Sequence, residues 1–151
     1  MILDKRSEFC NATALNTGAP GTYLIGDQID LGTARDVGNG EPLYLVITVD
    51  TPPTSGGAAT AQFTLASGDT ASIATNGTAS VHFQTKAFTI AEMTAGAVLA
   101  AVPLPIEGAA YKRFLGILQT TGTAAFTGGK INAFLTHDVA KWKRYNAPVQ
   151  V

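Results

Sequence analysis

The sequence has very few of the residues from which catalytic and metal sites are built. Its 151 residues include one cysteine, Cys10, and two histidines, His82 and His137. A single cysteine forms neither an intrachain disulfide nor a thiolate zinc cluster, so we expect Cys10 to be a small buried apolar residue. His137 and Asp138 are neighbours on an expected strand and point to opposite faces, which excludes a catalytic pair. We expect His82 to be a solvated side chain.

Charged side chains are also scarce, at 14% of residues against roughly 25% in average domains. So poorly charged a surface suits a subunit that is partly covered by other subunits. Residues 1–75 carry three basic and eight acidic side chains, or −5, while residues 76–151 carry seven basic and three acidic ones, or +4, which sums to the net charge of −1. Nucleic-acid-binding proteins usually have a strongly basic domain, so we expect no nucleic-acid partner.

Long apolar runs are absent as well. No stretch approaches the ~20 residues that span a bilayer, and the first residues, MILDKRSEF, lack the basic-then-apolar order of a signal peptide. We therefore expect no membrane partner and synthesis in a reducing cytoplasm.

Two glycines, Gly38 and Gly40, precede an apolar run, where a ligand-binding loop would also place glycines. A dinucleotide loop requires a strand, then G-x-G-x-x-G, then a helix. Here Glu41, Pro42 and an apolar strand follow, and the third glycine is missing. We expect a tight loop that leads into a strand, and no cofactor. The sequence also has no D-x-D-x-D-G series for calcium, so we expect no metal site.

The pattern that is present is alternation of apolar and polar residues with a period of two. Residues 61–65 place Ala61, Phe63 and Leu65 on one face, as a half-buried strand requires. Residues 43–49, LYLVITV, are apolar on both faces, which predicts a central strand of a sandwich. Seven or more such strands, separated by Gly-, Pro-, Asn- and Thr-rich turns, predict an all-β sandwich or barrel.

Two local signals refine this prediction. Asn76-Gly77 predicts a type I′ hairpin turn, because both residue types tolerate a positive φ. Thr89 and Glu92 form a capping box and Gly96 supplies a stop, which predicts one or two helical turns in a crossover between strands. No repeat or linker divides the chain, so we expect one domain over residues 1–151.

The C-terminus is the most distinctive surface signal. Trp142 and Tyr145 interleave there with the basic residues Lys141, Lys143 and Arg144. Such mixtures can bind single-stranded nucleic acid, but this cluster is short and the rest of the chain is neutral to acidic. We expect a tail that packs Trp142 against a subunit, its own or a neighbour's, with its cations facing acidic partners.

Four segments, in matching order, resemble the capsid cement (decoration) protein family of tailed bacteriophages, typified by the cement protein of a Bordetella podophage. They are ILDKRSEF, IDLGTARDVGNGEPLYLVITVD, VPLPIEGAAYKRFLGI and GKINAFLTHDVAKWKRY. The resemblance implies a jelly-roll β-sandwich of about eight antiparallel strands, with no catalytic residues. It further implies a virion protein, made in the cytoplasm of the bacterial host, that docks on the outer surface of the assembled head. There it would clamp adjacent major capsid proteins as a homo-oligomer, a trimer or a dimer.

We expect the termini to make the capsid contacts, through Asp4, Lys5 and Arg6 at one end and Trp142, Lys143, Arg144 and Tyr145 at the other. The alternative is a carbohydrate-binding jelly-roll module on the virion surface, which would make weak glycan contacts through several exposed aromatic side chains. Aromatic residues are only 8% of this chain and mostly fall at inward positions. An enzyme on a cupin-like barrel would need a histidine-rich metal triad, and two isolated histidines do not supply one.

Overall fold

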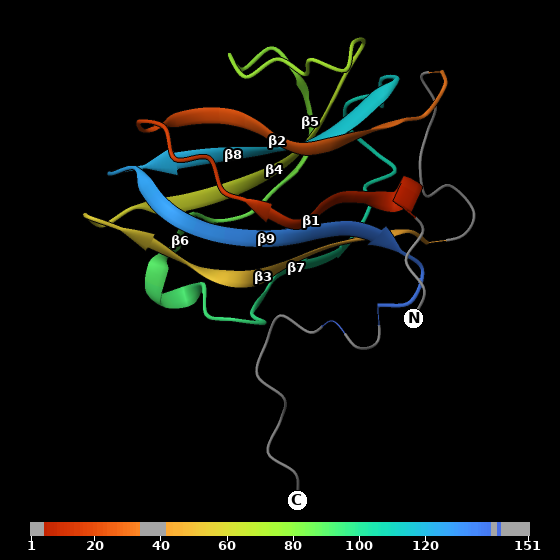
Figure 1. Ribbon diagram of the computed structural model, residues 1–151. Coiled ribbons are helices and arrows are strands. Elements are labelled where there is room, and N and C mark those ends of the chain that lie inside the picture. The colour runs from red at the N-terminus through yellow and green to blue at the C-terminus, as the bar shows by residue number, and fades with distance from the viewer. Residues whose placement is uncertain (1–4, 34–41, 140–141, 143–151) are drawn as a thin grey trace, which may run out of the picture.

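The computed structural model describes residues 5–33, 42–139 and 142, which form two antiparallel sheets packed face to face (Figure 1). The strands are β1 (Glu8–Ala14), β2 (Gly21–Asp30), β3 (Tyr44–Ser55), β4 (Thr60–Gly68), β5 (Ser80–Gln84), β6 (Phe88–Thr89), β7 (Val98–Pro103), β8 (Phe114–Gly122) and β9 (Phe126–Thr136). Two 3₁₀ turns accompany them, η1 (Lys5–Ser7) and η2 (Ile90–Glu92). No helix in these ranges is long and apolar enough to cross a membrane.

The strand order is that of a jelly roll. One sheet runs β1-β9-β3-β7 and the other β2-β8-β4-β5, with β6 also paired to β4. Because β8 lies along the whole of β4 on one side, β5 and β6 share the other side and are two pieces of one edge strand. With β5 and β6 counted as one strand, each sheet has four strands. Each strand along the chain then lies in the sheet opposite to the one before it, except that β4 and β5 are neighbours in the same sheet, as in a pair of Greek keys. The prediction of an all-β jelly roll of about eight strands is confirmed.

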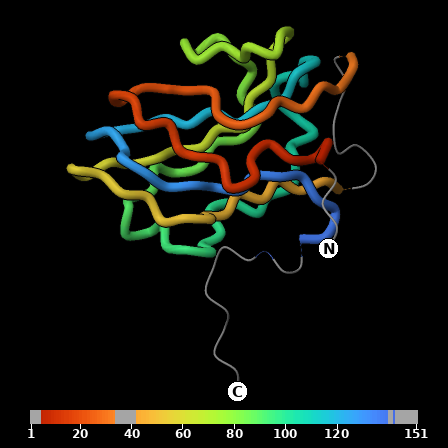
Figure 2. Tube along the Cα trace, in the orientation of Figure 1, coloured from red at the N-terminus to blue at the C-terminus, as the bar shows by residue number. Residues whose placement is uncertain are grey.

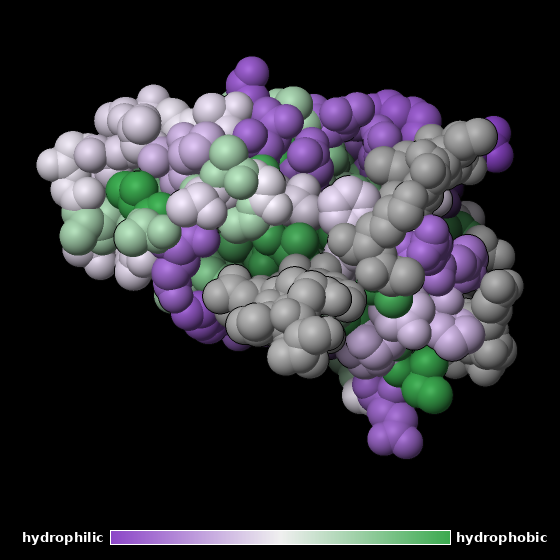
Figure 3. Space-filling view, turned by 90° about the horizontal axis from the view of Figure 1, so that it is seen from below, coloured by the Kyte–Doolittle hydropathy of each residue, from purple (hydrophilic) through white to green (hydrophobic). Residues whose placement is uncertain are grey.

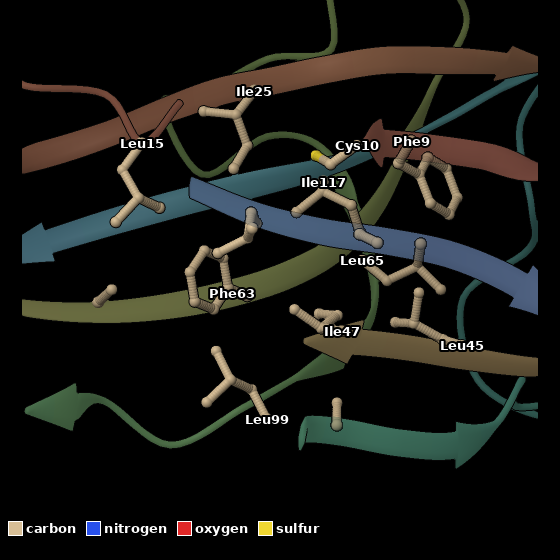
Figure 4. Close-up of a cluster of buried hydrophobic side chains, with 14 of the residues drawn as sticks. Phe9, Cys10, Leu15, Ile25, Leu45, Ile47, Phe63, Leu65, Leu99 and Ile117 are labelled. Carbon is tan, nitrogen blue, oxygen red and sulfur yellow. The ribbon is translucent and has the colours of Figure 1, made fainter. Parts of the chain in front are cut away.

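The core lies between the two sheets, where the inward faces of the strands meet (Figure 4). Phe63 and Leu65 of β4 are fully buried there, as their alternation predicted. In β3 every residue from Leu45 to Val49 is buried. This strand lies between β9 and β7, so the prediction of a central strand over this run is confirmed.

A second, smaller apolar cluster covers the outer face of the β2-β8-β4-β5 sheet. Its buried members are Ala66, Ile73 and Leu118, and Ile73 comes from the connection between β4 and β5. Gly116 makes room for this contact, since a Cβ at that position would lie 2.7 Å from Ile73 Cδ1.

The predicted Asn76-Gly77 hairpin turn is therefore wrong. Residues 69–79 form a long connection between β4 and β5, within which Ile73 is buried on the sheet. Gly77 has φ +90°, whereas Asn76 is not among the residues with positive φ. The Asn76 side chain instead accepts a hydrogen bond from the Thr78 N–H at 3.2 Å.

The predicted helix is present as the single turn η2, in the crossover between β6 and β7. Its capping box forms as expected, and the Thr89 N–H donates to Glu92 Oε2 at 2.9 Å. Gly96 follows with φ +76°. The turn is at the short end of the predicted length.

One side of the sandwich is closed by the close approach of β1 and β2. Figure 2 shows β1 (red) between β2 and the blue β9, with which it pairs. Gly26 makes this approach possible, because a Cβ there would lie 2.2 Å from Phe9 O and 2.6 Å from Cys10 Sγ. Its φ of +70° also favours glycine. The adjoining bulge in β2, between Ile25 and Ile29, bends the strand around this contact.

Replacing Gly26 by alanine should destabilise the fold more than replacing Gly32, which has φ +81° and no neighbour within 4 Å. Gly32→Ala adds only the left-handed backbone cost of about 1–2 kcal/mol. Gly26→Ala should lower the free energy of unfolding by the same backbone cost and by about 1–3 kcal/mol more, because the added methyl group is overpacked. Urea unfolding followed by circular dichroism measures both, and equal losses of free energy would contradict a close β1–β2 contact.

Candidate interaction surfaces

The N-terminal residues that we expected to contact a partner lie on the surface beside β2. Lys5 and Arg6 are exposed on η1. Lys5 Nζ lies 3.4 Å from Asp27 Oδ2 and 3.8 Å from Glu8 Oε2, so its charge is already matched within the chain. Asp4 lies outside the described residues.

The C-terminal expectation is confirmed in one respect, since Trp142 packs against its own subunit. Its ring meets the Phe134 ring of β9 edge to face, with centroids 5.2 Å apart. The Trp142 backbone N–H donates to Val139 O at 2.9 Å, while its buried indole N–H has no hydrogen-bond partner among the described residues. Lys143, Arg144 and Tyr145 lie outside the described residues.

The structure brings parts of the two terminal regions together. A hollow of about 220 Å³ lies between β1 and Trp142. It is lined by Glu8, Cys10, Asn11, Thr48, Asn132, Phe134 and Trp142. Figure 3 shows the molecule from below, where hydrophobic residues (green) lie among hydrophilic ones. The termini are thus not two independent surfaces, because β1 and Trp142 share one hollow.

The single thiol is confirmed as a small buried residue. Cys10 is 2% exposed, and burial raises the pKa of its thiol to about 12. It is therefore protonated at neutral pH. Within residues 5–33, 42–139 and 142, no three His, Cys, Asp or Glu side chains are grouped as metal ligands.

His82 is not a solvated side chain, so that prediction is wrong. A bulge opposite Leu65 and Ala66 makes His82 the extra residue of β5. Its ring stacks on Tyr111 at 3.9 Å, and Nε2 lies 2.7 Å from Ser67 Oγ. Partial burial lowers the pKa of His82. Because period-two alternation assumes a regular strand, the sequence pattern could not predict this position.

The Ser67–His82 pair is a support for the chain and not an accessible nucleophile. Ser67 is fully buried, and its Oγ also accepts the Lys112 N–H at 3.0 Å. The Tyr111 hydroxyl donates to Pro105 O at 2.7 Å. These contacts fix the end of the connection before β8 to β4 and β5, and the Tyr111–Pro105 bond ties the two ends of the connection together.

The connection between β7 and β8 carries an exposed apolar tip that sequence reasoning missed. Ile106 is 67% exposed, and Val81, next to His82, is 49% exposed. They are the exposed large hydrophobic residues in the part of the chain that the structure describes. The signal in the sequence was the single isoleucine of PIEGAA, between turn-forming residues. A single exposed apolar side chain is common on protein surfaces, so Ile106 does not by itself identify an interaction surface.

His137 takes part in a second loop anchor. Its Nδ1 lies 2.8 Å from Pro42 O, which ties the end of β9 to the chain entering β3. Gly38, Gly40 and Glu41, for which we expected a tight loop, lie outside the described residues.

An ion pair fixes the point at which the chain leaves β2. Arg113 Nε and the adjacent amino group donate to the two Asp30 carboxylate oxygens at 2.9 and 3.0 Å. The Arg113 hydrogen bond and the Gly32 N–H lower the pKa of Asp30 to about 2. The carboxylate favours the folded state above its ordinary pKa of 3.8, and this contribution is lost as the pH falls towards 2.

Removing the guanidinium should therefore raise the pKa of Asp30. In Arg113→Gln we expect the carboxyl titration, followed by ¹³C NMR, to move from about 2 towards 3.8. Lys112→Gln is the matched control, because Lys112 pairs with Asp69 at 3.2 Å and not with Asp30. An Asp30 titration that is the same in Arg113→Gln and in the parent would contradict the ion pair.

The partly buried position of His82 predicts a second pH dependence. Its folded pKa lies below the ordinary 6.5, so the unfolded chain binds more protons just below that pH. The free energy of unfolding should then decrease from about pH 7.5 to about pH 5.5. His82→Gln should flatten this change. Urea unfolding at the two pH values tests this, and an unaltered slope in His82→Gln would contradict it.

The family comparison covers nearly the whole sandwich. The family model Bbp16 matches residues 9–135, from the second residue of β1 to the penultimate residue of β9. Lys5, Arg6 and Trp142 lie outside the matched range. The search of curated proteins found no match. Since the model matches all nine strands of the described residues, the chain belongs to the Bbp16 family.

Proposed function

We propose that this protein is a structural virion protein that decorates a tailed-phage head and stabilises the lattice of its major capsid protein. The observation that carries the proposal is the Bbp16 match over the jelly roll, because the name of that family suggests a protein of a Bordetella phage. The resemblance of four sequence segments to phage cement proteins supports the finer role. In this proposal the protein is not an enzyme, and it acts on the outer surface of the capsid.

The anchored loop between β7 and β8 is suited to this role. Ile106 is presented by a connection whose base is held by the Tyr111–Pro105 hydrogen bond and the stacked His82 ring. Little conformational entropy is lost when a loop that is already ordered binds a partner. A small apolar contact can then contribute to affinity although few charges are available.

The proposed mechanism is preferential binding to the assembled shell. A protein that binds the assembled lattice better than free capsid subunits shifts the equilibrium towards the lattice by its differential affinity. A dimer or trimer that spans neighbouring capsid subunits makes several weak contacts at once, and avidity strengthens them together. The proposed contacts at the two termini remain Asp4, Lys5 and Arg6 at one end and Trp142, Lys143, Arg144 and Tyr145 at the other.

Carbohydrate binding is the second candidate, and the hollow beside Trp142 favours it. An indole and the amide groups of Asn11 and Asn132 line this hollow. Aromatic and amide groups together are common in ligand sites. A glycan array probed with the purified protein would detect such binding.

Reconstitution on heads tests the decoration function. Heads of the encoding phage, prepared without this protein, should bind the purified chain to saturation and release their DNA at a higher temperature when decorated.

Ile106→Asp should lower head affinity about tenfold or more, because it places a charge in an apolar contact. The matched control is Glu107→Gln on the same loop. Failure of the parent protein to bind heads would overturn the proposal.

The terminal contacts need a separate variant. A variant with alanine in place of Trp142, Arg144 and Tyr145 should occupy fewer sites on the same heads than the parent protein. The control Thr17→Ala, at an exposed position distant in sequence from the C-terminal tail, should bind like the parent. Undiminished occupancy would remove the C-terminal tail from the interface.

A further inference from the structure

The side of the sandwich opposite the β1–β2 contact is open. The edge strand β7 of one sheet and the edge strand β5 of the other face each other across a groove of about 350 Å³. The groove is lined by Phe83, Gln84, Thr85, Lys86, Phe88, Leu99, Ala100 and Val102. Its walls are therefore largely apolar side chains that continue the core to the surface.

The backbone of β7 presents hydrogen-bonding groups at this edge. Leu104 N–H donates to Leu43 O at 2.8 Å. Hydrogen-bonded and non-bonded pairs alternate in an antiparallel ladder, so Val102 and Ala100 bond to β3, and the N–H and C=O of Ala101 point away from it. Pro103 fits this assignment, because its backbone nitrogen, which carries no hydrogen, also faces away from β3.

The β7 edge carries no charged side chain, in contrast to β1 with Glu8 and β2 with Asp27 and Asp30. β2 carries Asp27 and Asp30 and a bulge, β1 has two register shifts, and β5 is bulged at His82. β7 also has one register shift with β3, at Leu99. From Ala100 to Pro103 it pairs regularly with β3, and the whole strand, VLAAVP, has no charged side chain. Natural sheets usually block such an edge unless another strand covers it.

The charge of the groove limits what can occupy it. Its one charged lining residue, Lys86, is ion-paired with Glu92. An occupant that brought an unpaired charge would lose solvation without gaining a partner. The fitting occupant is an uncharged, extended segment whose apolar side chains point into the groove while its backbone pairs with Ala101.

We propose that an extended, uncharged segment of the major capsid protein adds to the β7 edge as a fifth strand of the β1-β9-β3-β7 sheet and fills the groove. This inference rests on the proposed decoration function and assigns its docking site. The groove residues lie within the range matched by the Bbp16 model, whereas Lys5, Arg6 and Trp142 do not. Strand addition supplies affinity through backbone bonds and specificity through the side chains in the groove.

Proline at position 101 gives a direct test. Ala101→Pro removes the outward N–H and also fixes φ, and Pro103 already occupies an equivalent position in the same strand. We expect its affinity for undecorated heads to fall about tenfold or more, while Ala101→Ser, which keeps the N–H, binds like the parent. Circular dichroism checks that both variants fold. Equal binding of Ala101→Pro and the parent would overturn the assignment of β7.

Hydrogen exchange supplies an independent measurement on the parent protein. The Ala101 amide should become protected when the protein binds heads, while the amides of β1 remain unchanged. Protection of Ala101 in the free protein at high concentration would assign the edge to a second copy of this chain and overturn the capsid segment as its occupant. If the parent does not bind heads, the decoration function itself fails; if it binds without protection of Ala101, only the β7 site fails.

Discussion

The structure depends on the burial of a single apolar layer between two sheets that are joined on one side only. The fully buried Leu45 and Ile47 of β3 face Phe63 and Leu65 of β4 across that layer. On the closed side, β1 can lie close to β2 because Gly26 has no side chain. On the other side the described strands make no such crossing, and the apolar layer runs out to the surface between β5 and β7. The interaction surfaces of the molecule follow from this asymmetry.

The loops at the ends of the sheets are fixed mainly by neutral hydrogen bonds and ring stacking. His82, Tyr111 and Ser67 hold the β7–β8 connection, and His137 binds the carbonyl oxygen of Pro42. Separate exposed ion pairs add to these contacts, among them the bidentate Asp30–Arg113 pair and the Lys112–Asp69 pair. A chain with few charged residues can thus order its loops without charge networks, and its apolar side chains remain available at the tips.

Sequence reasoning predicted the features that depend on neighbours along the chain. Alternation identified the buried face of β4, and Thr89 with Glu92 identified the η2 cap. It failed where distant segments decide the conformation. Asn76-Gly77 is part of a long loop whose Ile73 packs in a cluster with Leu118 of β8, and the bulge at His82 lies in the pairing of β5 with β4. The open groove likewise follows from the order of strands in the two sheets, which no local pattern encodes.

The buried Cys10 has a consequence for a protein that is made inside a cell and works outside it, as proposed here. Release from the host exposes a virion to oxygen and to other oxidants. A thiol that is 2% exposed, with its pKa raised to about 12, offers them almost no thiolate. Neither sulfenic acid nor a crosslink between particles should form there, so the change of redox environment leaves this subunit chemically the same.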